Sequence, residues 1–247
     1  MKDDTSAWDL LSLGLGIGAS AAAVIAAIWG LWQLGKKWWD RSFGRRHAQA
    51  RILDQLACTV SMEFAESLLG VPLLITHPYV DDREERTYRL PGAWVSIEPR
   101  GGAVHLFSIT ITDPKMFYNI DKLTFGILKL KLGKETFAQV DNNLHDGENQ
   151  WLGARLAGYI RHYYLGNPGG YQQYWLSFNQ VGAGAHPSIW GQYQSGIYGN
   201  QGASPPDPAT ITANTLTVSI GSVEEVKERL VFGPHNDQLR LLPGVLG

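Results

Sequence analysis

The hydrophobic pattern begins with one long apolar run. Leu10 to Gly35 holds 26 consecutive residues without a formal charge, between Asp9 and Lys36. A bilayer core of about 30 Å needs roughly 20 apolar helical residues, so this run predicts a tilted transmembrane helix. Small residues recur in it at every fourth position: Gly14, Gly18, Ala22, Ala26 and Gly30. Because such a stripe lets helix backbones approach closely, we expect the span to pack against copies of itself.

A cleaved signal peptide and a buried soluble helix are the alternative interpretations of this run. Ala19-Ser20-Ala21 has the small residues of a cleavage site. However, the residues that precede the run are acidic rather than basic, and the apolar run continues through Leu34. The pattern therefore favours a retained span.

The charges beside the run predict its orientation. Five cations follow it closely: Lys36, Lys37, Arg41, Arg45 and Arg46. Lys and Arg stay on the cytoplasmic side of a span, so residues 1–9 are expected outside and residues 71–247 in the cytosol. The single cysteine, Cys58, fits a reducing compartment.

Residues 36–70 predict a basic, Trp-rich collar followed by an amphipathic stalk helix. Beyond Gly44, apolar residues fall at four-residue steps: Ile52, Leu56, Val60, Phe64 and Leu68. Gly70 and Pro72 end the pattern. This helix is either a rigid stalk that couples the domain to the span or the first helix of the domain, and both readings can hold.

The rest of the chain predicts a cytosolic α+β domain, with a mixed or antiparallel sheet and flanking helices. Alternating apolar positions and Gly or Pro turns indicate strands at Thr87–Leu90, Ala93–Glu98, Ala103–Thr112, Phe125–Leu132 and Thr210–Ile220. Helical spacing indicates helices at Trp151–Tyr164 and Val223–Val231, with a polar connector at Asn142–Asn149.

Residues 163–206 contain no Asp, Glu, Lys or Arg, and Gly and aromatic residues are spread through them. A charge-free run of this kind is not typical of a solvated disordered tail. We expect a structured loop system, with short strands allowed. Subunit contact, ligand binding and plain packing all remain open for it.

The chain contains no recognisable catalytic motif, so we expect no enzyme, no cofactor and no metal. His145-Asp146-Gly147-Glu148 places an imidazole near two carboxylates, which is also typical of a surface turn.

Local basic and aromatic residues suggest ligand binding despite the net charge of −2. In single-stranded nucleic acid sites, cations follow the backbone while bases stack on aromatic rings. The candidate ligand-binding residues are Lys129, Lys131, Lys134, Arg161, Tyr171, Tyr174 and Trp175. The three lysines also fit the solvent face of a half-buried sheet, so both interpretations stay open.

The layout of an N-out span, a basic collar, a stalk and a soluble sensor resembles the single-span channel effectors of bacterial anti-phage systems, in particular those of the Hailong type. The resemblance implies a tetrameric membrane channel controlled by an oligodeoxyadenylate or related nucleotide signal, with a nucleotidyltransferase as its source. A membrane-anchored binding or scaffold protein is the first alternative. A tethered hydrolase that uses His145 or His162 is the second.

Overall fold

The structure is a computed structural model that describes residues 45–77, 83–152, 157–185 and 207–223. The chain divides into two units, Met1–Ala48 and Gln49–Gly247, and nearly all described residues belong to the second. No helix among the described residues is long and apolar enough to cross a membrane. The predicted span with its small-residue stripe lies outside these residues, so its expectations stay predictions.

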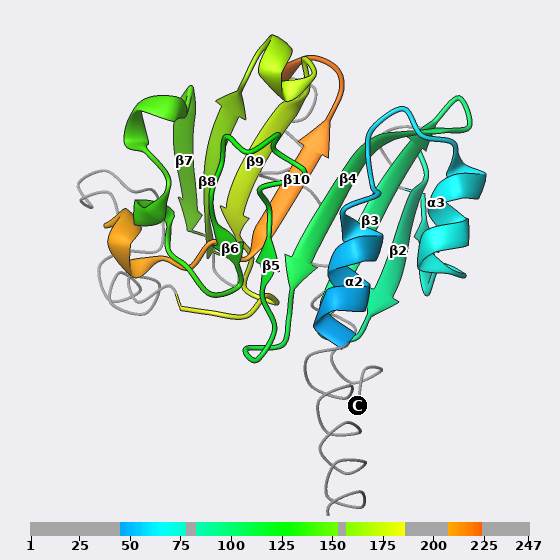
Figure 1. The fold of residues 1–247 in the computed structure, drawn as a ribbon, viewed down its shortest axis with the longest axis horizontal. Coiled ribbons are helices and arrows are strands. Elements are labelled where there is room, and N and C mark those ends of the chain that lie inside the picture. The colour runs from blue at the N-terminus through cyan, green and yellow to red at the C-terminus, as the bar shows by residue number, and fades with distance from the viewer. Residues whose placement is uncertain (1–44, 78–82, 153–156, 186–206, 224–247) are drawn as a thin grey trace, which may run out of the picture. The chain divides into compact units, whose positions relative to one another are not determined.

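The second unit is an α+β domain built on an antiparallel sheet of eight strands. The strands are β1 (Leu74–Thr76), β2 (Glu85–Leu90), β3 (Ala93–Arg100), β4 (Ala103–Ile111), β7 (Gly147–Leu152), β8 (Ala157–Tyr164), β9 (Gln173–Phe178) and β10 (Thr215–Ser219). Their order, β1-β2-β3-β4-β10-β9-β8-β7, joins two four-stranded halves through their last strands (Figure 1). The two halves therefore repeat one topology about a seam between β4 and β10.

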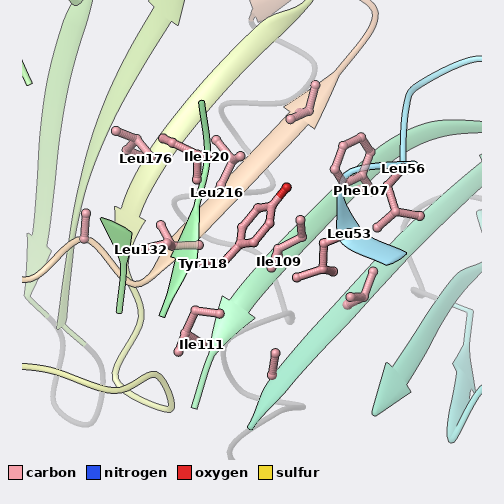
Figure 2. Packing of buried hydrophobic residues seen from close by; sticks show 14 of the residues in the cluster. Leu53, Leu56, Phe107, Ile109, Ile111, Tyr118, Ile120, Leu132, Leu176 and Leu216 are labelled. Carbon is pink, nitrogen blue, oxygen red and sulfur yellow. The ribbon is translucent and has the colours of Figure 1, made fainter. Parts of the chain in front are cut away.

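One face of the sheet carries the hydrophobic core. Helices α2 (Arg45–Leu53) and α3 (Met62–Leu69) cover the first half, and the small hairpin of β5 (Tyr118–Asn119) and β6 (Lys131–Leu132) covers the second (Figure 1). Figure 2 shows side chains from both layers meeting over the central strands. Buried members of this core include Leu53, Leu56, Phe107, Ile109, Tyr118, Ile120, Leu132, Leu176 and Leu216.

The opposite face of the sheet carries many hydroxyl residues, together with the buried side chains of Trp94, Leu106, Ile160 and Trp175. Cross-strand partners share a face, and the pairing register aligns eight hydroxyl residues from five strands there: Thr87, Ser96, Ser108, Thr110, Ser177, Thr215, Thr217 and Ser219. We call this set the hydroxyl face. Across the seam, Ser108 Oγ lies 2.6 Å from Thr217 Oγ1, and Thr110 Oγ1 lies 2.9 Å from Thr215 Oγ1. The described helices and the β5–β6 hairpin all lie on the other face (Figure 1).

The prediction of one stalk helix up to Gly70 is wrong, because two short helices occupy this stretch. Between them the backbone bonds to the sheet instead: Thr59 N donates to Val104 O at 2.8 Å, and Val104 N donates to Val60 O at 2.8 Å. Ser61 then caps α3, its hydroxyl accepting from Phe64 N at 3.2 Å. Most of the predicted stripe packs on the core: Leu56 is buried, and Ile52, Val60 and Leu68 pack against the core, whereas Phe64 is 40% exposed. The other buried residues of this stretch include Leu53, Met62, Ala65 and Leu69.

The predicted helix Trp151–Tyr164 is also wrong, because this stretch contributes to strands β7 and β8. Strand β7 begins at Gly147, within the predicted connector. Strand β8 pairs with β7 on one side and with β9 on the other, which satisfies its backbone on both edges. Tyr159 and Tyr163 fit a period of four, but with Arg161 between them they also fit a strand face.

The other predicted elements are confirmed in part. Strands at Thr87–Leu90, Ala93–Glu98 and Ala103–Thr112 correspond to β2, β3 and β4. The predicted strand Thr210–Ile220 shrinks to β10, and Phe125–Leu132 shrinks to Lys131–Leu132, because hydrogen-bonded turns occupy residues 120–128. Within the charge-free stretch, β9 is a central strand. Residues 186–206 and most of the predicted helix Val223–Val231 lie outside the described residues.

Candidate ligand-binding site

Two aromatic side chains stand out on the surface because each is presented by the tip of a tight turn. Phe125 is 58% exposed and Tyr171 is 65% exposed. They come from turns more than forty residues apart, yet the turns touch: a methyl group on Gly170 would lie 3.6 Å from Phe125 Cζ. We call Phe125 and Tyr171 the aromatic pair.

The first turn is held rigidly by Thr124. Its side chain is fully buried, and its hydroxyl lies 3.0 Å from Ile120 O and 3.1 Å from Leu128 O. The same oxygen accepts from Leu128 N at 3.3 Å. Gly126 N closes the tip by donating to Asp121 O at 2.6 Å. One buried side chain therefore ties both ends of the turn that carries Phe125.

The second turn connects β8 to β9. Gly166 O accepts from Gly169 N at 3.1 Å and from Tyr171 N at 2.9 Å. The buried Tyr174 hydroxyl donates to Gly169 O at 2.8 Å from the core side of the turn. Burial raises the pKa of Tyr174 to about 12, so this hydroxyl keeps its proton at neutral pH. The turn under Tyr171 is thus fixed to the core.

Both aromatic residues have an unusual backbone conformation. The φ angle is +54° at Phe125 and +56° at Tyr171, where a residue other than glycine costs about 1–2 kcal/mol. Bulky residues are genuine outliers in this region, and such strain clusters at functional sites. Glycine or asparagine would suit these turns better for folding alone. Phe125 and Tyr171 are therefore candidate binding residues.

Cations lie in the same segment as Phe125. Lys122 is exposed and pairs with Asp54 at 2.6 Å. Lys129 is exposed and forms no ion pair with the residues that the structure describes. The other two predicted lysines have partners: Lys131 lies 3.0 Å from Glu135, and the Lys134 ammonium lies 5.4 Å from the Phe117 ring centre. Lys129 is therefore the predicted cation best placed for an external anion.

The structure separates the remaining predicted site residues. Tyr174 and Trp175 are neighbours in β9, so they point to opposite faces of the sheet, and both are buried. Trp175 lies on the hydroxyl face beside His162, with ring centres 5.0 Å apart. Arg161 is buried beneath the core side of β8. Of the predicted set, only Tyr171 is an exposed aromatic.

Phe125 was missed as a site residue because residues 125–132 read as a strand. The Phe-Gly step at 125–126 was the available turn signal. A positive φ at a bulky residue cannot be read from one sequence, since it depends on tertiary contacts such as those of Thr124.

The described residues contain no group of three or more His, Cys, Asp or Glu that could hold a metal ion. No family model matches the chain, and no curated protein matches it. A crystal structure of a protein named as a putative beta-lactamase inhibitor from Streptococcus mutans is similar in part. It shares 15% identity, covers 48% of this chain and 75% of its own, and has a TM-score of 0.21. At this score the likeness supports no conclusion about fold or function.

Proposed function

We propose that the protein is a single-span membrane effector whose sheet domain senses a nucleotide or a single-stranded oligonucleotide. The observation that carries the ligand class is the aromatic pair, two exposed rings on neighbouring, strained and well-anchored turns. Bases stack on such rings with little sequence preference, each stack contributing about 1–3 kcal/mol. Lys129, which follows Phe125 in the same segment, supplies a positive charge for a phosphate group.

Rigid presentation supports this proposal. A ring that is already fixed loses little freedom when a ligand binds, so more of the stacking energy appears as affinity. The hydrogen bonds of Thr124 and Tyr174 hold the two turns in that state before any ligand arrives.

The membrane part of the proposal rests on the sequence. The charge-free run of residues 10–35 supplies the span, and its small-residue stripe supplies contacts between copies, with a tetramer as the expected assembly. Ligand binding in the cytosolic domain would then bias how the spans pack and so control a channel in the inner membrane. A nucleotidyltransferase would be the source of the signal.

The binding test uses the detergent-solubilised full chain and a fluorescent single-stranded oligodeoxyadenylate. Loss of one stacked ring should weaken affinity about 5- to 150-fold, so Phe125→Gly and Tyr171→Gly should each fall in that range. Phe64→Ala removes an exposed aromatic from α3 and is the matched control. Equal affinity of all three variants and the wild type would remove the aromatic pair from the proposal.

The channel test changes the stripe instead of the domain. Gly18→Leu or Ala22→Leu should abolish membrane permeabilisation while leaving oligonucleotide binding intact. Unchanged leakage would exclude the pore.

A membrane-anchored binding protein is the second candidate. The observation that favours it is that the candidate site lies wholly within the second unit. The site is therefore complete without the span, and a tether is all that the span would need to provide. It predicts that an unrelated span in place of residues 10–35 preserves function, whereas the channel proposal predicts its loss.

A further inference from the structure

Arg161 is a buried positive charge on the core side of the sheet. Its side chain is 2% exposed. Its Nη1 donates to Asn142 Oδ1 at 2.8 Å and to Phe137 O at 3.4 Å, and its Nε donates to Tyr159 Oη at 2.8 Å. All three of these acceptors are neutral. Burying a charge in this way is costly unless an anion accompanies it.

The anion that accompanies Arg161 comes from the rim of the sheet. Glu148 Oε2 lies 3.2 Å from Arg161 Nε and also accepts from the Tyr159 hydroxyl. The Glu148 side chain is 40% exposed, and its strand β7 is the last in the order of the described sheet. The half-exposed Glu148 on this outer strand therefore links the buried Arg161 to the surface.

Glu148 stays ionised in this position. Partial burial disfavours its charged form, but the hydrogen bond from Tyr159 and the charge of Arg161 outweigh that effect and lower the pKa. At neutral pH the ionised Glu148 carboxylate therefore contacts Arg161 and Tyr159 on one side and solvent on the other.

Two buried polar atoms near this carboxylate, Tyr163 Oη and His145 Nδ1, make no close hydrogen bond to a described residue. The Arg161 guanidinium interacts with the Tyr163 hydroxyl and favours its ionised form, although burial outweighs this effect and raises the pKa of Tyr163 to about 12. Tyr163 is fully buried, and its ring centre lies 6.4 Å from that of His145. A buried hydroxyl that makes no hydrogen bond is unfavourable for the folded state. Glu148 alone therefore does not satisfy the donors gathered here.

We propose that the Arg161 cluster is an oxyanion site in which an external phosphate or carboxylate group replaces the side chain of Glu148. The incoming group accepts hydrogen bonds from Arg161 and Tyr159, as Glu148 does, and from the Tyr163 hydroxyl, which Glu148 leaves unused. Planar guanidinium groups suit both kinds of oxyanion. The site stands on residues outside the aromatic pair, so either can fail without the other.

The test measures anion binding by the detergent-solubilised full chain, using calorimetric titration and the thermal unfolding midpoint. Inorganic phosphate and acetate are the two probes, with chloride at equal ionic strength as the reference. Glu148→Gln removes the competing carboxylate while keeping the size of the side chain, so probe affinity should rise about tenfold or more. Binding of one probe, or of both, identifies the ligand chemistry and supports the site.

Tyr163→Phe separates binding from folding. Its hydroxyl makes no close hydrogen bond to a described residue and interacts only with Arg161 beside it, so stability should change little, whereas probe affinity should fall about tenfold or more because a hydrogen bond to a charged group is lost. Tyr88→Phe is the matched control, since Tyr88 is also fully buried and its hydroxyl likewise has an arginine, Arg86, beside it, but on β2. Equal affinities of these two variants, or no response of Glu148→Gln to either probe beyond that to chloride, would overturn the proposal.

Discussion

Phe125 has a positive φ, so its replacement by glycine should affect stability differently from the same replacement at a residue with an ordinary φ. Phe125→Gly relieves about 1–2 kcal/mol of left-handed strain, but Gly loses about 0.5–1 kcal/mol more conformational entropy on folding. The ring is 58% exposed, so its buried two-fifths contribute roughly 0.6–1.2 kcal/mol of a full side chain's 1.5–3. We therefore expect Phe125→Gly to change the free energy of unfolding by about 1 kcal/mol or less.

Comparison with Phe125→Ala separates the backbone strain from the ring contacts, because both variants lack the ring. Alanine loses the same ring contacts but keeps the strained backbone, so the glycine variant should be the more stable of the two by up to about 1 kcal/mol. At Phe64 the order should reverse, because this residue lies within helix α3, where glycine costs about 1 kcal/mol relative to alanine.

Denaturant unfolding of the full chain in detergent, followed by tryptophan fluorescence, gives the four midpoints needed. An alanine variant at 125 that matches or exceeds the glycine variant would refute the strain at Phe125. The inference that the turn holds its ring for binding would then lose its main support.

Three further predictions concern other parts of the domain. Thr124→Val should cost about 1–3 kcal/mol, because Ile120 O and Leu128 N lose a buried partner; the same denaturation assay tests it, and Thr59→Val, at an exposed position, serves as the comparison. Because the folded-state pKa of Glu148 is lowered, the stability that it contributes should be present above the unfolded value of about 4.3 and lost as pH falls through the folded value. Unfolding midpoints of wild type and Glu148→Gln between pH 7 and 3 should therefore converge on acidification, and a constant difference would contradict this. Burial raises the pKa of the Cys58 thiol to about 12, so maleimide labelling at pH 8 should be slow until denaturant is added; rapid labelling of the native protein would show that Cys58 is accessible.

The strands of the first half of the sheet were predictable because local and tertiary signals agree there. Alternation along Ala103–Ile111 and the turns at Pro91-Gly92 and Gly101-Gly102 mark β2, β3 and β4 without knowledge of their partners. The strand β8 was not predictable in this way. Tyr159, Arg161 and Tyr163 alternate on the core face, and a buried arginine in that series hides the alternation from a hydrophobic pattern.

The candidate site was predictable only in part, because its geometry depends on contacts distant in sequence. Tyr171 was found through composition, whereas Tyr174 and Trp175 drew attention for the same reason and are buried in the sheet. Phe125 depends on a turn closed by one buried threonine. Composition can identify aromatic residues near turns, but it cannot tell which rings the fold leaves outside.

The hydroxyl face lets the hydrogen bonds across the seam between the two halves of the sheet run in either direction. A serine or threonine hydroxyl can either donate or accept, so each of the two cross-seam pairs can reverse its polarity by rotation about the C–O bonds of both residues, without displacement of the backbone. Neighbouring amides or carbonyls on this face could therefore be matched by reorienting protons alone. Valine in place of the threonines and alanine in place of Ser108 would keep the strand pairing at the seam. These side chains could then neither donate nor accept a hydrogen bond.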